Sequence, residues 1–283
     1  MKIAVWKTGH EIADTVAEAV AAGLPNADLV DFRKQYYGMI EDYDIHIGYG
    51  ILRGMDEVFK CAEAHGIPWF HLDRGYFNPG HFGGKYRVSL RGTQQTGNWP
   101  EGECRVPMQR WRGFDESKQV LVVPPTDAVR EFFNIDKWDG FGSNYYAYGR
   151  KTPTHYSDWL LFAISQREVK KMDFVIRRKG DTSALNFLDY NYVKTFNSSL
   201  GWQAIQAGVP CVSDPVHSMV GSWYSKIPLE NLSEAQYADR HKLFVCMEAL
   251  QLTLSEMREG KLWPLMEKLL DRPLNSDDRL GLP

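Results

Sequence analysis

Short hydrophobic runs alternate with amphipathic stretches along the first third of the chain. Each run has the length of a strand, and each amphipathic stretch has a helical period that ends at a glycine, as at Gly23 and Gly66. The expected strands are 2–7, 27–32, 44–48 and 68–72, and the expected helices are 11–22 and 55–65. This alternation predicts a parallel, doubly wound sheet whose ligands bind beyond the carboxyl ends of the strands, in loops 8–10, 49–54 and 73–77.

A second alternation of the same kind begins at residue 119. Its expected strands are 119–123, 173–177, 192–196 and 210–213, and its expected helices are 128–133, 154–171 and 200–206. Residues 217–228 are expected to form a loop. A final helical region, 234–270, follows a capping sequence at Asn231-Leu232-Ser233 and breaks near Gly260.

The fold class is therefore α/β, with two Rossmann-like domains that face each other across a cleft. The pattern places an N-terminal domain at residues 1–115 and a C-terminal domain at 116–262. Residues 263–283 are expected to form a helix and tail that pack back on the first domain.

Residues 74–112 interrupt the pattern, and we interpret them as an insertion at the carboxyl edge of the first sheet. They contain seven basic and two acidic residues, a local charge of +5 (seven minus two), whereas the whole chain has a net charge of −3. The basic residues are Arg74, Lys85, Arg87, Arg91, Arg105, Arg110 and Arg112, and the interleaved aromatic residues are Tyr76, Phe77, Phe82, Tyr86, Trp99 and Trp111. This composition is typical of a surface that binds a polyanion or a sugar; the alternative is an ordinary surface excursion with solvated arginines.

Composition counts against several classes of protein. The 283 residues include no apolar run long enough to span a membrane, Met1 leads directly into a strand, and the four cysteines are widely spaced. These features predict a cytoplasmic protein with reduced thiols and no membrane span. Because the chain lacks G-x-G-x-x-G, G-x-x-x-x-G-K-[ST] and G-x-S-x-G motifs, a dehydrogenase, a P-loop kinase and an α/β-hydrolase are disfavoured.

The segment from Tyr192 to Asp214 has the strongest functional signal. A strand leads through Asn197, Ser198 and Ser199 into a helix, so that backbone N–H groups point out of the helix start, where an anion is favoured. The alternative is that Asn197 and Ser198 only cap the helix. Arg177, Arg178 and Lys179 end the preceding strand. We expect the two loops to be neighbours and to bind a diphosphate through guanidinium and N–H groups.

This segment resembles the nucleotide-sugar segment of GT-B glycosyltransferases of the capsule-polysaccharide type. The resemblance lies in the run Asn197-Ser198-Ser199-Leu200-Gly201-Trp202-Gln203-Ala204 and in Gly208-Val209-Pro210-Cys211-Val212. The basic strand end at Arg177 and the segment 245–263 extend it over much of residues 119–263. It implies a nucleotide-sugar co-substrate, expected to be a UDP-sugar, and no other cofactor. Gln203 stands near the position where many members carry a glutamate for the donor ribose, so that contact has less charge assistance here.

A second resemblance lies in the first domain. Residues 42–44 and the run Trp69-Phe70-His71-Leu72-Asp73-Arg74 are similar in layout to the DNA beta-glucosyltransferase of T-even phages. That resemblance implies that Asp73 is the base, that the acceptor is a hydroxymethylated pyrimidine in double-stranded DNA, and that the location is the host cytoplasm if a phage encodes the chain. The expected acceptor contacts are Arg53, Arg74, Tyr76, Lys85, Arg87 and Arg91.

An inverting sugar transfer needs a base for the acceptor hydroxyl and positive charge for the departing diphosphate. Asp73 is the first candidate for the base, although it is also a plausible turn-capping residue paired with Arg74, and His10 is its rival. No metal ligand is expected, and a loosely bound divalent cation is left open. Two other functions stay open: transfer to a polysaccharide or lipid-linked glycan, and a non-catalytic nucleotide- or DNA-binding module.

Overall fold

A computed structural model describes residues 1–35, 39–80, 82–103, 106–133, 174–227 and 229–271. The chain divides into two compact units, one of Met1–Cys104 with Phe244–Pro283 and one of Arg105–Leu243. The chain therefore passes from the first unit to the second at residues 104–105, before the expected domain boundary at residue 115. The chain also returns to the first unit at Phe244, well before residue 262, because a strand and two helices after that point complete the first unit.

The first unit contains a six-stranded sheet in the order β10-β5-β4-β3-β1-β2. Its four parallel strands are the expected ones: β1 (Ile3–Lys7), β2 (Ala27–Asp31), β3 (Ile45–Tyr49) and β4 (Trp69–Arg74). Two antiparallel strands extend this sheet, β5 (Lys85–Leu90) from the insertion and β10 (Gln251–Thr253) from the C-terminal region. The sequence pattern did not predict either of them. Residues 74–112 are therefore partly built into the sheet.

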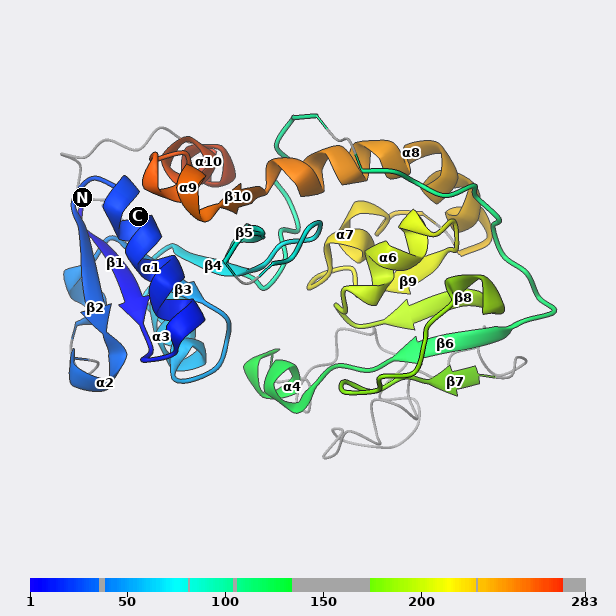
Figure 1. Cartoon of the computed structure of the whole chain (residues 1–283), viewed down its shortest axis with the longest axis horizontal. Helices are drawn as coiled ribbons and strands as arrows, with labels where there is room; N and C mark the ends of the chain where they lie inside the picture. Colours follow the sequence, from blue (N-terminus) through cyan, green and yellow to red (C-terminus); the bar gives the residue numbers. More distant parts are fainter. Residues whose placement is uncertain (36–38, 81, 104–105, 134–173, 228, 272–283) are drawn as a thin grey trace. The chain divides into compact units, whose positions relative to one another are not determined.

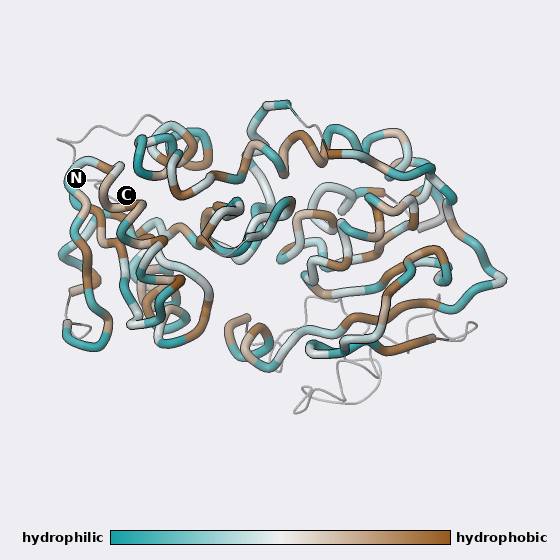
Figure 2. The backbone as a smooth tube through the Cα atoms, in the orientation of Figure 1, coloured by the Kyte–Doolittle hydropathy of each residue, from teal (hydrophilic) through white to brown (hydrophobic). Residues whose placement is uncertain are grey.

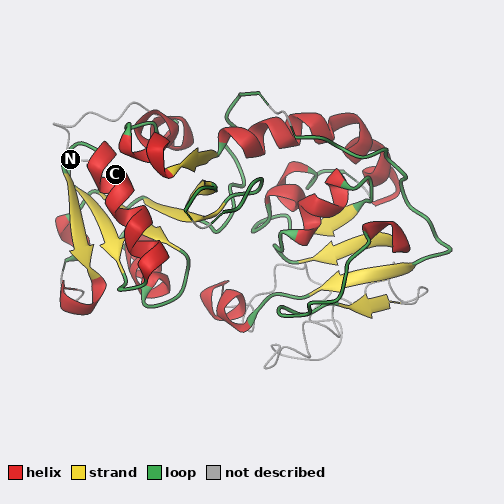
Figure 3. Ribbon diagram, viewed as in Figure 1, coloured by secondary structure: helices red, strands yellow, loops and turns green. Residues whose placement is uncertain are grey.

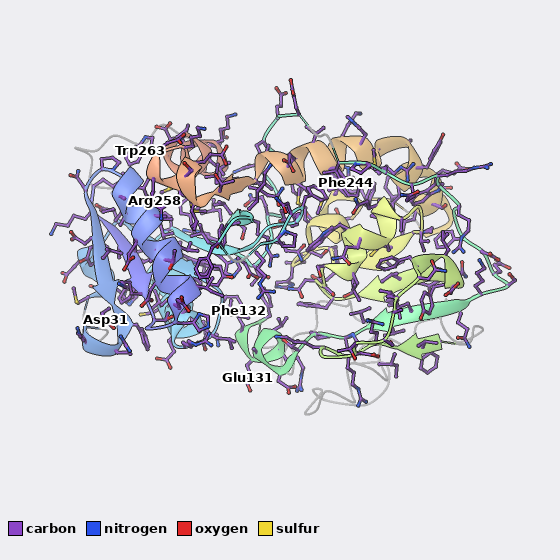
Figure 4. The ribbon with its side chains drawn as sticks, viewed as in Figure 1. Asp31, Glu131, Phe132, Phe244, Arg258 and Trp263 are labelled. Carbon is purple, nitrogen blue, oxygen red and sulfur yellow. The ribbon has the colours of Figure 1, made fainter. Side chains whose placement is uncertain are left out.

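Helices cover this sheet (Figures 1 and 3). They are α1 (Glu11–Gly23), α2 (Phe32–Gln35), α3 (Met55–Ala64), α9 (Leu254–Arg258) and α10 (Leu262–Leu270), with a 3₁₀ turn at Ile40–Asp42. Helix α10, which covers the start of the expected C-terminal segment, contacts β5 and so packs on the first unit as expected, and α9 packs against α1. Residues 272–283 of the expected tail lie outside the described residues. Arg258 marks the end of α9 and Trp263 the start of α10 in Figure 4.

The second unit contains a four-stranded, fully parallel sheet in the order β7-β6-β8-β9. The strands are β6 (Gln119–Val123), β7 (Phe174–Ile176), β8 (Tyr190–Thr195) and β9 (Cys211–Ser213), all close to the expected ranges. Its helices are α4 (Asp127–Phe133), α6 (Leu200–Gln206), α7 (Met219–Trp223) and most of α8 (Leu229–Ala249), with a 3₁₀ turn at Phe187–Asp189. The last residues of α8, from Phe244 onward, belong to the first unit. The expected helix at 154–171 lies outside the described residues. Two α/β units with parallel strands confirm the fold class.

The core of the second unit lies on one face of this sheet. The buried residues on that face are Val120, Val122, Tyr192 and Phe196, and β6 is coloured as hydrophobic in Figure 2. Helix α6 packs on the opposite face, since a Cβ atom at Gly201 would lie 3.1 Å from Cys211 Sγ. The outer edge of β9 is covered by Gln236 of α8, whose amide accepts from Cys211 N (3.0 Å) and donates to Cys211 O (2.6 Å).

Three expectations about the C-terminal third are wrong. Asn231-Leu232-Ser233 lies inside α8, which begins at Leu229, and the expected loop at 217–228 contains α7. The expected helix at 234–270 is interrupted at β10 as well as between α9 and α10, because Gln251–Thr253 pairs with β5. None of the helices that the structure describes is long and apolar enough to cross a membrane.

Candidate functional site

The four-stranded sheet has a topological switch point between β6 and β8. The chain passes from β6 to β7 on one side, whereas β8 pairs with β6 on the other side. Ligands of open α/β sheets bind at such points, beyond the carboxyl ends of the strands. The loops that leave the sheet here are residues 124–126 after β6 and Asn197–Ser199 after β8.

The Asn197–Ser199 loop is half-buried and joins β8 to α6. Ser198 Oγ accepts a hydrogen bond from Leu200 N (3.3 Å), and Ser198 N donates to Thr195 Oγ1 (3.2 Å). Ser199 is the N-cap residue of α6, but its side chain makes no capping hydrogen bond. Capping therefore accounts for Ser198 and not for Ser199.

Helix α6 contributes little to anion binding by itself. It has seven residues, so its ends lie roughly 10 Å apart at about 1.5 Å per residue. The partial negative charge at its carboxyl end offsets part of the partial positive charge at its start. Gln203, the expected ribose contact, is half-buried on this helix. Side chains at the carboxyl edge must therefore provide most of any affinity for a ligand.

The basic loop after β7 does not adjoin the Asn197–Ser199 loop, contrary to the expectation. Strand β6 lies between β7 and β8, which separates their ends by roughly 10 Å, two interstrand spacings. The Arg177 guanidinium also bonds its own loop, donating to Ser183 Oγ (3.1 Å), Asp181 O (3.0 Å) and Ser183 O (2.8 Å). Arg178 and Lys179 are exposed. Sequence order alone had suggested the wrong neighbour.

The actual neighbour of β8 on its other side is β9, which ends at a buried acidic residue. Asp214 is fully buried, and its Oδ1 accepts from Val216 N (3.0 Å), His217 N (2.7 Å) and His217 Nδ1 (2.9 Å). The His217 ring stacks on Phe196, 5.3 Å between centroids. Neither residue was predicted from the sequence. The Asp-x-x-His spacing directly after the Gly-Val-Pro strand was the signal that could have indicated them.

A cavity of ≈ 220 Å³ lies in the second unit between β8, β9 and α7. Tyr192, Lys194, Ser213 and Tyr224 contribute its polar lining, and Lys194 is buried. The Tyr224 hydroxyl has no hydrogen-bond partner among the described residues, and burial raises the pKa of this phenol. The cavity is therefore a second place in this unit where a polar ligand group could be held.

The first sheet has its own switch point, between β1 and β3. The chain passes from β1 to β2 on one side, and β3 pairs with β1 on the other. His10 belongs to the loop after β1; its Nδ1 is buried without a hydrogen-bond partner among the described residues. The N–H groups of Thr8 and Gly9 are already bonded to Asp14 Oδ1 (2.9 and 3.1 Å). The His10 side chain is thus the chemically open group of this loop.

Asp73 lies at the carboxyl end of β4, one strand further out than β3. Its Oδ2 accepts from Arg87 Nη2 (2.7 Å) and its Oδ1 from Arg74 N (2.8 Å), and 34% of its side chain is exposed. Burial alone would raise the pKa of Asp73, but the Arg87 charge, with His71 and Arg74, holds that pKa below its usual range. Asp73 is therefore ionised at neutral pH and is a weak base.

His71 lies on the same strand face as Asp73. It is buried, and burial lowers the pKa of its imidazole to about 4. Its ring packs edge-on against Phe59, 6.1 Å between centroids. His71 is therefore neutral at pH 7 and fills space behind the carboxylate.

Most of the basic residues of the insertion are engaged within the fold. Lys85 is paired with Glu248, and Arg91 donates to Gly66 O (2.8 Å). Arg87 donates to Asp73, to Thr93 O (3.2 Å) and to Arg74 O (3.0 Å), and its guanidinium lies 5.6 Å from the centre of the Tyr76 ring. Arg112 donates to the carbonyl groups of Leu188 and Tyr190.

The remaining expected acceptor contacts fall into two groups. Tyr76 is 4% exposed, so its ring supports Arg87 from the interior. Arg53 and Arg74 are exposed, and Arg53 has a positive φ of 59° in the loop after β3. The local charge of the insertion is therefore a poor guide to a polyanion surface, because much of it is neutralised or hydrogen-bonded inside the unit. Among the described residues, no group of three His, Cys, Asp or Glu side chains could hold a metal ion.

No family model matches the chain, and no curated protein matches it. Among solved structures it is similar to Thermosulfurimonas dismutans KpsC, a beta Kdo 2,4 transferase, at 12% sequence identity and a TM-score of 0.37. The alignment covers 75% of this chain and 79% of that chain. A similarity at this level does not identify the activity of the chain.

Proposed function

We propose that the chain is a glycosyltransferase of the GT-B type, which transfers a sugar from a nucleotide sugar, expected to be a UDP-sugar, to a hydroxyl acceptor. One observation carries the proposal. The segment that resembles nucleotide-sugar sites folds as β8, α6 and β9, with its Asn197–Ser199 loop at the switch point of a parallel sheet. The donor phosphates would contact this loop, with Arg178 and Lys179 as more distant cations.

The two candidates for the base, Asp73 and His10, lie at the carboxyl edge of the first sheet. In the transfer, the acceptor oxygen bonds to the sugar, the bond from the sugar to the diphosphate breaks, and the acceptor proton goes to the base. The pairing of Asp73 with Arg87 weakens its basicity, whereas His10 lies at the switch point itself. The geometry therefore favours His10 more than the sequence did. Turnover by His10→Ala and Asp73→Asn variants separates the two.

The acceptor is proposed to be a glycan hydroxyl, in a polysaccharide or a lipid-linked glycan. A hydroxymethylated pyrimidine in DNA is the competing acceptor, and it was favoured by the charge of the insertion. Because Lys85, Arg87 and Arg91 all bond within the unit, they offer few contacts to a phosphate backbone. Arg53 and Arg74 are too few for the steep salt dependence that duplex binding shows.

The test is a panel of nucleotide sugars incubated with hydroxymethylated DNA, unmodified DNA and a glycan acceptor. Release of nucleoside diphosphate reports turnover, and mass spectrometry of nucleosides and glycans locates the sugar. A mass shift on glycan alone supports the proposed acceptor, and a shift on hydroxymethylated DNA replaces it with the competing one. Nucleotide binding without turnover on any acceptor indicates a non-catalytic module.

Two variants locate the donor within the second unit. Ser198→Ala is expected to weaken UDP binding by about tenfold, the usual effect of losing one hydrogen bond to a charged group. Lys194→Met, in the separate cavity, is expected to leave UDP binding unchanged. The reverse pattern would place the donor in the cavity and contradict the role of the Asn197–Ser199 loop.

A further inference from the structure

The pairing with Asp214 fixes the orientation of the His217 ring. A carboxylate only accepts hydrogen bonds, so His217 Nδ1 carries the hydrogen in the 2.9 Å contact with Asp214 Oδ1. Nε2 then points away from Asp214, on the far side of the ring. The other carboxylate oxygen, Oδ2, is buried without a hydrogen-bond partner among the described residues. Asp214 Oδ1 thus holds the imidazole together with the backbone N–H groups of Val216 and His217.

Two aromatic rings hold the plane of the imidazole. Phe196 stacks on it at 5.3 Å and 28°, and Phe133 meets it at 4.4 Å and 63°. Only 17% of the His217 side chain is exposed. A ring that is stacked on Phe196, in contact with Phe133 and bonded at one nitrogen loses little further freedom when it binds a ligand, which favours tight binding.

The same two rings place His217 at the switch point. Phe133 ends α4, which follows β6, and Phe196 directly follows β8. Asp214 N donates to Phe196 O (3.0 Å), so the turn that carries His217 is tied to the residue before Asn197. The ring therefore contacts residues from both sides of the point where a ligand of this sheet is expected.

We propose that His217 is a phosphate ligand of the nucleotide-sugar site, and that Asp214 positions it. In this role the imidazolium Nε2–H donates to a phosphate oxygen held by the Asn197–Ser199 loop, and the Asp214 carboxylate balances the imidazolium charge. The inference rests on the proposed function, because it places a residue in the same donor site. The imidazolium would also provide a positive charge beside the Asn197–Ser199 loop, which the Arg177 loop does not adjoin.

Two substitutions separate the roles of the two ring nitrogens. Asparagine places its amide near the position of Nδ1 and keeps a donor for Asp214, whereas glutamine reaches the position of Nε2. Binding of UDP to the full chain is measured by calorimetry, with GDP and CDP as further probes. His217→Asn is expected to weaken UDP binding by about 10- to 100-fold, and His217→Gln to stay within about threefold of the wild type. Thermal unfolding of both variants verifies that they fold.

The control is His241→Asn, an exposed histidine on α8 whose loss should leave UDP binding unchanged. As a second readout, the ¹⁵N resonance of His217 Nε2 in the wild type is expected to move toward the imidazolium range when UDP is added. Wild-type affinity in His217→Asn overturns the proposal. So does an equal loss in the Asn and Gln variants, since that result indicates a structural role.

Failure of the inference can be told apart from failure of the proposed function. If the wild type binds none of the three nucleotides, both are overturned. If it binds UDP and Ser198→Ala weakens that binding while His217→Asn does not, the proposed donor site stands and the role of His217 alone is wrong.

Discussion

Arg87 organises the carboxyl edge of the first sheet. Its guanidinium bonds Asp73, Thr93 O and Arg74 O and covers the Tyr76 ring. Burial acts to raise the pKa of Asp73, and the Arg87 charge is the largest of the effects that lower it, followed by those of His71 and Arg74.

Arg87→Met is therefore expected to raise the pKa of Asp73, whereas Arg87→Lys keeps the charge and raises it less. In the wild type, the pKa of Asp73 is lower in the folded protein than in the unfolded chain, where it is about 4. Asp73 therefore stabilises the fold above about pH 4, and this contribution is lost as the pH falls through the pKa of the folded protein. In Arg87→Met the half-buried carboxylate loses its main cationic partner, so the loss of stability is greatest at neutral pH. NMR titration of the Asp73 carboxyl carbon measures the shift. An unchanged pKa in Arg87→Met would contradict the role given to Arg87.

His46 gives the first unit a second pH dependence. The fully buried ring accepts from Trp6 Nε1 (3.0 Å) and donates from Nε2 to Ile40 O (3.1 Å), and burial lowers the pKa of His46 to about 4. Between that value and about 6.5, the unfolded chain binds a proton that the folded chain does not, so stability falls as the pH falls.

The expected loss from His46 is at most about 3 kcal/mol between pH 7 and pH 4. His46→Gln, which does not titrate, should show a shallower fall in urea-unfolding free energy over this range, and the exposed His65→Gln should match the wild type. A slope in His46→Gln equal to that of the wild type would show that His46 is not the titrating group.

At the scale of elements, the turn between α6 and β9 depends on Gly208. Its φ is 83°, and a Cβ atom there would lie 2.1 Å from Arg110 O. Arg112 N donates to Gly208 O (2.8 Å), which draws the two segments together. The candidate segment is therefore held in place by a stretch of chain about a hundred residues away.

Gly208→Ala is expected to cost about 3 kcal/mol or more, from the positive φ and the backbone clash together. Gly180→Ala is the matched control. Its φ of 92° is similar, but nothing lies within 4 Å of the added methyl, so it should cost only about 1 kcal/mol. Urea unfolding of both variants makes the comparison, and equal costs would mean that the close approach to Arg110 contributes nothing.

Elements that follow a local pattern could be read from the sequence, and their order in the sheets could not. Strands β1 to β4, β8 and β9 and helices α1, α3 and α6 appear in the hydrophobic period, whereas the short helix α2 does not. The position of β6 between β7 and β8 is decided by crossovers that leave no local signal, so the Arg177 loop was placed next to the wrong strand. Strand β10 is three residues long and is placed by its pairing with β5, which no hydrophobic period reveals.

The candidate site shows the same division between local and nonlocal information. The strand–turn–helix pattern around Asn197–Ser199 can be recognised from the local sequence, and in the structure this loop lies at the carboxyl edge of the sheet. His217 has a local signal in its spacing from Asp214, but its contacts with Phe196 and Phe133 come from segments that are distant in sequence. The basic residues Lys85 and Arg91 counted as surface charge because their partners, Glu248 and Gly66 O, are distant in sequence.

At the scale of the molecule, the first unit is discontinuous and the second is inserted into it. A fragment of residues 105–243 is expected to unfold cooperatively by itself, whereas residues 1–103 should not, because they lack β10, α9 and α10. Joining residues 1–103 to 244–271 through a short flexible linker should restore folding, since a Cβ atom at Gly102 would lie 2.9 Å from Ala249 Cβ. Far-UV circular dichroism and urea titration test all three, and a cooperative transition in residues 1–103 alone would contradict this division.

The antiparallel pair of β5 and β10 also has a consequence during synthesis. Strand β5 ends at Leu90, and its partner begins at Gln251. At about 5–20 residues per second, the ribosome needs roughly 8–30 s to cover that distance. Throughout this interval the nascent chain carries an unpaired strand edge while the inserted unit emerges and folds. The first unit can be completed only late in translation, so a chaperone that shields nascent β5 is expected to raise the yield of folded protein more than one acting after release.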